Sequence, residues 1–182
     1  MVPGAPDAGG AGPVGRGRRV AGVLSGLDEA TASRVVGWSL VVVQFALLGL
    51  LLIGESGDLW PTPGPVRAVA LALVVVGCVI MAGAGWQIRR AITASPLPNE
   101  RTALMDRGWF GPVRHPIYTG LVTTAAGLAL SRASVLAVAC LVGLGVLLQV
   151  KARFEETVLS RRFPGYAEYM ARTGRLLPRL RR

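Results

Sequence analysis

The sequence predicts an all-α integral membrane protein with about four transmembrane helices, a C-terminal helical hairpin and a cytosolic C-terminal cap. Three observations support this class. The chain of 182 residues is 52% hydrophobic, with a mean hydropathy of +0.50. It nevertheless carries a formal net charge of +10, a combination that is unusual for a soluble domain of this length. The charges are also concentrated between long uncharged segments.

The chain begins with a segment, residues 1–26, that is dense in glycine and proline. It has too few large apolar side chains to offset the entropy of ordering, so we expect a disordered tail ahead of a membrane domain at residues 27–182. Its arginine cluster is not followed by an apolar stretch with a cleavage site, so no signal peptide is expected.

Four uncharged segments are the predicted membrane spans. Residues 35–54 and 68–88 are each long enough, at about 1.5 Å per residue, to cross a hydrocarbon layer of roughly 30 Å. The proline-rich and glycine-rich segment 55–65 between them is expected to be an external loop. Residues 117–131 and 133–150 are shorter, and only Arg132 separates them. They are predicted to form two helices joined by a tight turn.

The basic residues predict the orientation in the membrane. Four precede the first span, five lie between the second and third, and nine follow residue 150. Only Arg67 and Arg132 remain for the other side, so the positive-inside rule places both termini and the central loop in the cytoplasm. The basic tail is expected to attract anionic lipid headgroups. No nucleic-acid partner is expected, because no recognition helix or aromatic RNA-binding pattern occurs.

Metal and disulfide chemistry are not expected. Cys78 and Cys140 fall inside apolar segments, where they are predicted to pack between helices. The chain has one histidine and no clustered carboxylates beyond Glu155 and Glu156, which is a poor ligand set for a metal. The oligomeric state stays open, since glycines such as Gly143 and Gly145 suit either self-association or internal packing.

The only histidine, His115, lies in the sequence RHPIY at residues 114–118. In a structural interpretation, Pro116 begins the third helix and His115 caps it. In a functional interpretation, the helix start presents free backbone N–H groups to an anionic group of a cofactor, and the imidazole adds a hydrogen bond. The residues alone leave both interpretations open.

An acidic pair, Glu155 and Glu156, lies on an amphipathic continuation of the last span that Pro164 and Gly165 should end. The two acids could simply pair with the neighbouring Lys151, Arg153 or Arg161, which contributes little. Carboxylates at the boundary of a bilayer are, however, candidates for function. Tyr166 and Tyr169 are expected to anchor a short C-terminal helix.

The order GWFGPVRHPIYTG, uncharged hairpin, EETVLSRRFPGYAEYMARTGRLLP resembles the isoprenylcysteine carboxyl methyltransferase family and its phospholipid N-methyltransferase relatives. The resemblance covers residues 95–180. It implies a small bundle of transmembrane helices with S-adenosylmethionine in a cytosolic pocket that the C-terminal part of the chain closes.

The resemblance also assigns site residues. Glu155 would face the cofactor and the reaction centre. Lys151 stands where the prenylcysteine enzymes have an arginine that engages the substrate, and lysine cannot hold a carboxylate with two parallel hydrogen bonds. The contacts to the cofactor would come from the loop before the motif and from the motif itself, at Leu104, Met105, Phe110, His115, Pro116, Ile117 and Tyr118.

The expected function is therefore methylation of a small lipophilic or lipid-like acceptor, at a carboxyl oxygen or an amine nitrogen. The enzyme would mainly hold donor and acceptor in line and exclude water. Glu155 would stabilise the cationic donor and Lys151 an anionic acceptor, and with an amine acceptor Glu155 or Glu156 would take the proton. Two alternatives are an NADPH-dependent enzyme like the sterol reductases, which Arg101 and Arg107 keep open, and a non-catalytic lipid-binding protein.

Overall fold

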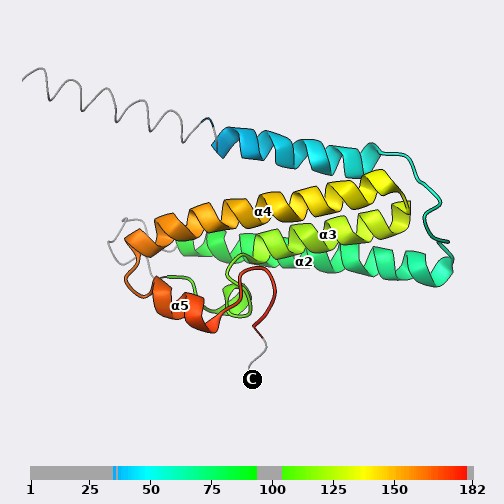
Figure 1. Ribbon diagram of the computed structural model, residues 1–182. Coiled ribbons are helices and arrows are strands. Elements are labelled where there is room, and N and C mark those ends of the chain that lie inside the picture. The colour runs from blue at the N-terminus through cyan, green and yellow to red at the C-terminus, as the bar shows by residue number, and fades with distance from the viewer. Residues whose placement is uncertain (1–34, 36, 94–103, 180–182) are drawn as a thin grey trace, which may run out of the picture. The chain divides into compact units, whose positions relative to one another are not determined.

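The structure is a computed structural model that describes residues 35, 37–93 and 104–179. The chain divides into two units, Met1–Val42 and Val43–Arg182, and an apolar helix over Gly37–Ile53 runs across their boundary. The helices that follow it are α2 (Gly64–Thr93), the short 3-10 helix η1 (Gly108–Phe110), α3 (Pro116–Arg132), α4 (Val135–Arg162) and α5 (Tyr166–Arg172) (Figure 1). The all-α class is confirmed. The predicted tail, residues 1–26, and Arg101 lie outside the described residues.

Among the residues that the structure describes, two helices are long and apolar enough to cross a membrane. An 18-residue stretch within Gly64–Arg90 of α2 has a mean hydropathy of 2.5, and one within α4 has a mean hydropathy of 2.2. Large apolar side chains such as Val75 and Val79 on α2, and Val142 and Val146 on α4, are exposed, as lipid-facing residues are. The helix Gly37–Ile53 is apolar but shorter, and α3 has 17 residues.

The predicted helical hairpin is confirmed. Helices α3 and α4 are joined by Ala133, which adopts a left-handed conformation with φ 47°, and Ser134, whose hydroxyl accepts a hydrogen bond from the backbone N–H of Ala137 at 3.2 Å. The Arg132 guanidinium donates to the carbonyls of Leu52 and Gly54. The last carbonyls of the helix Gly37–Ile53 thereby gain partners that a helix end cannot supply itself.

Helices α2 and α3 approach each other closely at glycines. A Cβ atom on Gly77 would lie 2.5 Å from the carbonyl oxygen of Gly120, and one on Gly127 would lie 2.5 Å from that of Ala70. Small residues of this kind allow helix backbones to approach closely in membranes. The glycines named from the sequence have other surroundings: a Cβ atom on Gly143 would lie 3.6 Å from the Leu47 side chain, and one on Gly145 would have no such neighbour within 4 Å.

The second helix of the hairpin continues to Arg162, well past the uncharged segment, as predicted. Phe163 and the Pro164-Gly165 pair then turn the chain into α5, whose Tyr166 and Tyr169 are both buried. After α5 the chain runs parallel to the segment that precedes α3. The Arg114 N–H donates to the Gly174 carbonyl at 2.8 Å, and the His115 N–H donates to the Arg175 carbonyl at 3.1 Å. This pairing places the C-terminal segment beside the RHPIY motif (Figure 1).

The glycine contact between α2 and α3 predicts a difference between two matched substitutions in α2. In Gly77→Ala the new methyl group would lie 2.3 Å from the Thr124 hydroxyl, so overpacking should lower the free energy of unfolding by about 1–3 kcal/mol. Gly85→Ala should have no such effect, because nothing lies within 4 Å of its Cβ position. Thermal unfolding in detergent measures both. Equal melting temperatures for the two variants would contradict this account of the packing.

Candidate active site

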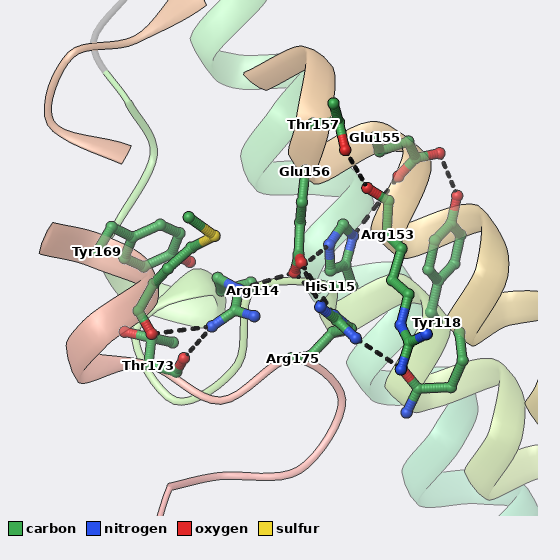
Figure 2. A network of polar contacts seen from close by, with 12 residues as sticks. Arg114, His115, Tyr118, Arg153, Glu155, Glu156, Thr157, Tyr169, Thr173 and Arg175 are labelled. Carbon is green, nitrogen blue, oxygen red and sulfur yellow. Dashed lines mark hydrogen bonds and ion pairs between the residues drawn. The ribbon is translucent and has the colours of Figure 1, made fainter. Parts of the chain in front are cut away.

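A buried carboxylate, that of Glu156, is the centre of the polar network (Figure 2). The Arg114 Nε donates to its Oε1 at 2.9 Å, and Arg175 donates from Nε to both oxygens at 3.0 Å and from Nη2 to Oε2 at 2.6 Å. A charge in this position needs partners, because removal from water is otherwise very unfavourable. Hydrogen bonding to Glu156 raises the pKa of Arg175 above its usual range. The network joins α4, the start of α3 and the C-terminal segment.

Arg114 also stabilises the end of α5. Its Nη1 donates to the carbonyl of Met170 at 3.1 Å and to that of Thr173. These carbonyls belong to the last turn and the C-cap of α5, where backbone acceptors lack partners within the helix. One guanidinium therefore pairs with Glu156 and satisfies the end of a helix.

His115 occupies the cap position of α3 and Pro116 is the first helical residue, as predicted, but the imidazole does not cap the helix. It lies between two carboxylates, with Nδ1 3.5 Å from Oε2 of Glu155 and Nε2 3.3 Å from Oε1 of Glu156. Burial lowers the pKa of His115 below its usual range, although both carboxylates act to raise it. A neutral imidazole has a single N–H, so only one of the two carboxylates can accept it at a time.

The Glu155 side chain lies in a more exposed environment than that of Glu156. Its side chain is 39% exposed, and its Oε1 accepts a hydrogen bond from the Tyr118 hydroxyl at 2.5 Å. The Tyr118 ring stacks on the His115 imidazole, with 5.4 Å between centroids and 4° between planes. His115, Tyr118 and Glu155, here called the Glu155 cluster, thus combine a carboxylate open to solvent with two groups that fix its position.

Lys151 does not pair with either glutamate in the part of the chain that the structure describes. Its ammonium donates to Oε1 of Gln44 at 3.2 Å and lies 5.4 Å from the centroid of the Tyr118 ring. The suggested pairing of the acids with neighbours on their own helix is also wrong for Glu156, whose partners are Arg114 and Arg175.

A cavity of about 340 Å³, here called the loop cavity, lies beside this network. Leu104, Met105 and Phe110 form one part of its wall, and Arg114 links it to Glu156. Its other lining residues come from α4, α5 and the turn between them: Leu159, Arg162, Phe163, Tyr166 and Tyr169. The surface is therefore mainly apolar and aromatic, with two cationic groups.

The segment before the RHPIY motif is held in place from two sides. The Gln87 side chain of α2 donates to the Arg107 carbonyl at 2.8 Å and accepts from the Trp109 N–H at 2.9 Å. The Tyr169 hydroxyl donates to the Phe110 carbonyl at 2.5 Å. Burial raises the pKa of Tyr169 to about 12, so this hydroxyl keeps its proton at neutral pH. The wall of the loop cavity is thus fixed by contacts with α2 and α5.

The structure separates the residues that the sequence had grouped as cofactor contacts. Leu104, Met105 and Phe110 line the loop cavity, whereas His115, Tyr118 and Glu155 form the adjoining cluster. Pro116 is fully buried at the start of α3, and Ile117 does not line the cavity. The lining residues Arg114, Leu159, Arg162, Phe163, Tyr166 and Tyr169, and the role of Arg175, were not predicted from the sequence.

A helical bundle with two membrane-crossing candidates, and a cluster of acids, histidine and tyrosine beside an apolar cavity, has the features of a small membrane enzyme. A family model described as phospholipid methyltransferase matches residues 66–165, more than half of the chain, and the chain belongs to this family. Its members are membrane enzymes that use S-adenosylmethionine to methylate a lipid.

The family match supports one of the two branches of the resemblance. It falls on the phospholipid methyltransferases, which are grouped with the isoprenylcysteine carboxyl methyltransferases at a higher level. No curated protein and no solved structure matches the chain. The prediction of a membrane methyltransferase that uses S-adenosylmethionine is confirmed, and methyl transfer is favoured over NADPH-dependent reduction.

Because the two acids have different surroundings, replacing Glu156 should lower the free energy of unfolding much more than replacing Glu155. Glu156→Gln would leave two guanidinium groups without their carboxylate and should lower the free energy of unfolding by about 3 kcal/mol. Glu155→Gln removes a half-exposed charge and should change it by less than about 1 kcal/mol. Unfolding in detergent, followed by circular dichroism, compares them. Similar losses in both variants would overturn the assignment of Glu156 as the structural acid.

The lowered pKa of His115 predicts a dependence of stability on pH. The unfolded chain, in which histidine titrates near its usual value of about 6.5, binds the proton more readily than the folded protein. The contribution of His115 to the free energy of unfolding should be complete above the unfolded pKa. It should decrease as the pH falls below that pKa and through the lower pKa of the folded protein. His115→Gln should therefore lose less stability than wild type between about pH 7 and pH 5. Parallel melting-temperature curves for the two proteins would contradict this.

Proposed function

We propose that this protein is a phospholipid N-methyltransferase that moves the methyl group of S-adenosylmethionine to the headgroup amine of a phospholipid such as phosphatidylethanolamine. The observation that carries the proposal is the Glu155 cluster beside the loop cavity, in a chain of this family. A half-exposed carboxylate, with a tyrosine and a neutral histidine to hold it, suits the removal of a proton from an amine.

The residues present fit the cofactor. The apolar and aromatic walls at Met105, Phe110 and Tyr166 suit the adenosine, and the Arg162 guanidinium at the same cavity suits a carboxylate. Glu155 supplies a negative charge for a sulfonium. When bound, S-adenosylmethionine supplies an electrophilic methyl group. In this proposal His115, Pro116, Ile117 and Tyr118 act mainly by forming and positioning the cluster, while Leu104, Met105 and Phe110 contact the cofactor.

The acceptor amine must lose a proton before it can react, since an alkyl ammonium titrates near pH 10. Glu155 accepts this proton and releases it to water through its exposed side, while Tyr118 and His115 keep the carboxylate in place. The bound cofactor would supply its methyl group to the neutral nitrogen, and its sulfur would keep the electron pair of the carbon–sulfur bond. Glu156 is not the base, because Arg114 and Arg175 occupy both of its oxygens.

Lys151 acts as a positioning residue in this proposal. Its ammonium contacts the Tyr118 ring and Gln44, so it restricts the tyrosine that holds Glu155. A direct contact between Lys151 and an anionic acceptor, as the resemblance implies, would require its side chain to leave Gln44.

The proposed topology keeps four membrane spans, with the active site and both termini in the cytoplasm. One-sided basic residues support this orientation. In this arrangement residues 27–182 form the membrane methyltransferase domain, and residues 151–182 form a cytosolic cap. The cofactor would reach the loop cavity from the cytoplasm, whereas the lipid acceptor would arrive from the bilayer.

Glu155→Gln tests the proposed base. Methyl transfer from radiolabelled S-adenosylmethionine to phosphatidylethanolamine in mixed micelles should fall by roughly 10²–10⁴-fold, the usual contribution of general base catalysis. Binding of S-adenosylhomocysteine should remain measurable by calorimetry. Glu168→Gln, at an exposed acid in the first turn of α5, is the matched control and should keep full activity. Unchanged turnover in Glu155→Gln would exclude this residue as the base.

Binding measurements test the proposed cofactor site independently of the acceptor. Purified protein should bind S-adenosylhomocysteine and not NADPH, and Phe110→Ala should weaken this binding because Phe110 lines the loop cavity. Binding of NADPH alone by folded protein would indicate a reductase. Binding of neither would favour a non-catalytic lipid-binding protein.

A further inference from the structure

A second hollow, of about 560 Å³, lies between α3, α4 and the C-terminal segment. It shares no lining residue with the loop cavity. Its apolar lining includes Val122 of α3 and Val142, Val146 and Val150 of α4, and its polar lining includes Gln149 and Arg153. We call it the α3/α4 groove.

We infer that the α3/α4 groove is the binding site for the acceptor lipid, with an acyl chain along the valines and the phosphate at Arg153. The inference rests on the proposed function and adds the location of the acceptor and the residue that recognises its phosphate. Neither the family match nor the RHPIY motif assigns a role to these residues.

The walls of the groove suit a hydrocarbon chain. Val142, Val146 and Val150 are more than half exposed, and they lie on a helix that is long and apolar enough to cross the membrane. The Cβ position of Gly145 has no heavy atom within 4 Å, so the groove has room between the valines. A polar ligand would make no favourable polar contacts with these walls. An acyl chain could exchange its apolar contacts with the bilayer for similar contacts with the valine side chains.

The polar end of the groove suits one phosphate. Within the described part of the chain, no acid pairs with the Arg153 guanidinium, whereas Arg175 nearby is paired with Glu156. The groove therefore carries one uncompensated positive charge, which complements the single negative charge of a phosphodiester. A guanidinium can hold two phosphate oxygens with parallel hydrogen bonds.

The spacing along α4 also fits a phospholipid. Val142 and Arg153 are separated by about 16 Å along the axis, from a rise of about 1.5 Å per residue, which is comparable to the length of an acyl chain. Arg153 lies just past the uncharged segment that ends at residue 150, at the level expected for headgroups.

The polar end of the groove is connected to the proposed reaction centre. Gln149 in the groove accepts a hydrogen bond from Arg175 at 3.3 Å, and Arg175 binds Glu156, which contacts His115. On α3 the groove residue Thr119 directly follows Tyr118 in the sequence (Figure 2 shows Tyr118, Arg153 and Arg175). A headgroup amine beyond a phosphate at Arg153 would therefore lie beside the residues that must receive it.

Photolabelling tests the inference without requiring turnover. Phosphatidylethanolamine with a photoactivatable group in one acyl chain is mixed with the protein in maltoside micelles, which contain no phosphate, and the labelled peptides are identified by mass spectrometry. Labelling should concentrate on the groove faces of α3 and α4. Uniform labelling of all exposed apolar helix faces, including α2, would overturn the inference.

Substitutions test the apolar wall of the α3/α4 groove and its phosphate-binding end separately. Val146→Trp should fill the groove and remove most of the labelling, and Arg153→Gln should reduce it roughly ten-fold, as expected for the loss of one charge-assisted pair. Arg161→Gln is the matched control on the same helix, because Arg161 is exposed and does not line the groove. Binding of S-adenosylhomocysteine at the separate loop cavity should be unchanged in all three, which verifies folding.

Competition and activity distinguish the failure of this inference from that of the proposed function. Unlabelled phosphatidylethanolamine should compete better than diacylglycerol with the same chains, and equal competition would exclude phosphate recognition by Arg153. Normal methyl transfer in Val146→Trp and Arg153→Gln would overturn the groove as the acceptor site while leaving the methyltransferase intact. Specific labelling without methyl transfer in wild type would overturn the proposed function and leave the lipid site.

Discussion

The Glu156 carboxylate is the constraint on which the rest of the site depends. Because a carboxylate cannot be buried alone, two guanidinium groups from distant parts of the chain must reach it. Arg114 does so from the start of α3, and its remaining donors hold the end of α5. Arg175 does so from the segment that pairs with residues 113–115. The wall of the loop cavity and the position of His115 both follow from this assembly.

The helices could be predicted from the sequence because they depend on local properties. The absence of charge, the single Arg132 between two apolar segments and the Pro164-Gly165 pair are visible in short windows, and the hairpin and its continuation to Arg162 agree with them. Side-chain partners are not local. The sequence suggests Lys151 as a partner for the acidic pair, but in the structure its ammonium binds Gln44 and lies over the Tyr118 ring. Spacing along one helix cannot include competitors from other helices.

The site could be predicted only where a motif also determines the direction in which its side chains point. The structure places Tyr118 of the RHPIY motif beside Glu155, and three of the residues that the resemblance implies as cofactor contacts line the loop cavity. Residues two apart on a helix face different sides, so Pro116 is buried while Tyr118 reaches Glu155. The groove at Arg153 gave no sequence signal, because an exposed arginine beside valines is common on helices near a membrane surface.

The pairing of Glu156 with Arg175 also has an evolutionary consequence. The family match ends at residue 165, so it includes the buried acid but not its second cation. A related chain that buries the same acid must therefore supply its second cation from beyond the matched region. Substitution of the arginine therefore requires a second change. Either another basic residue must appear within reach of the acid, or the acid must be lost as well. The two positions should change as a pair across lineages.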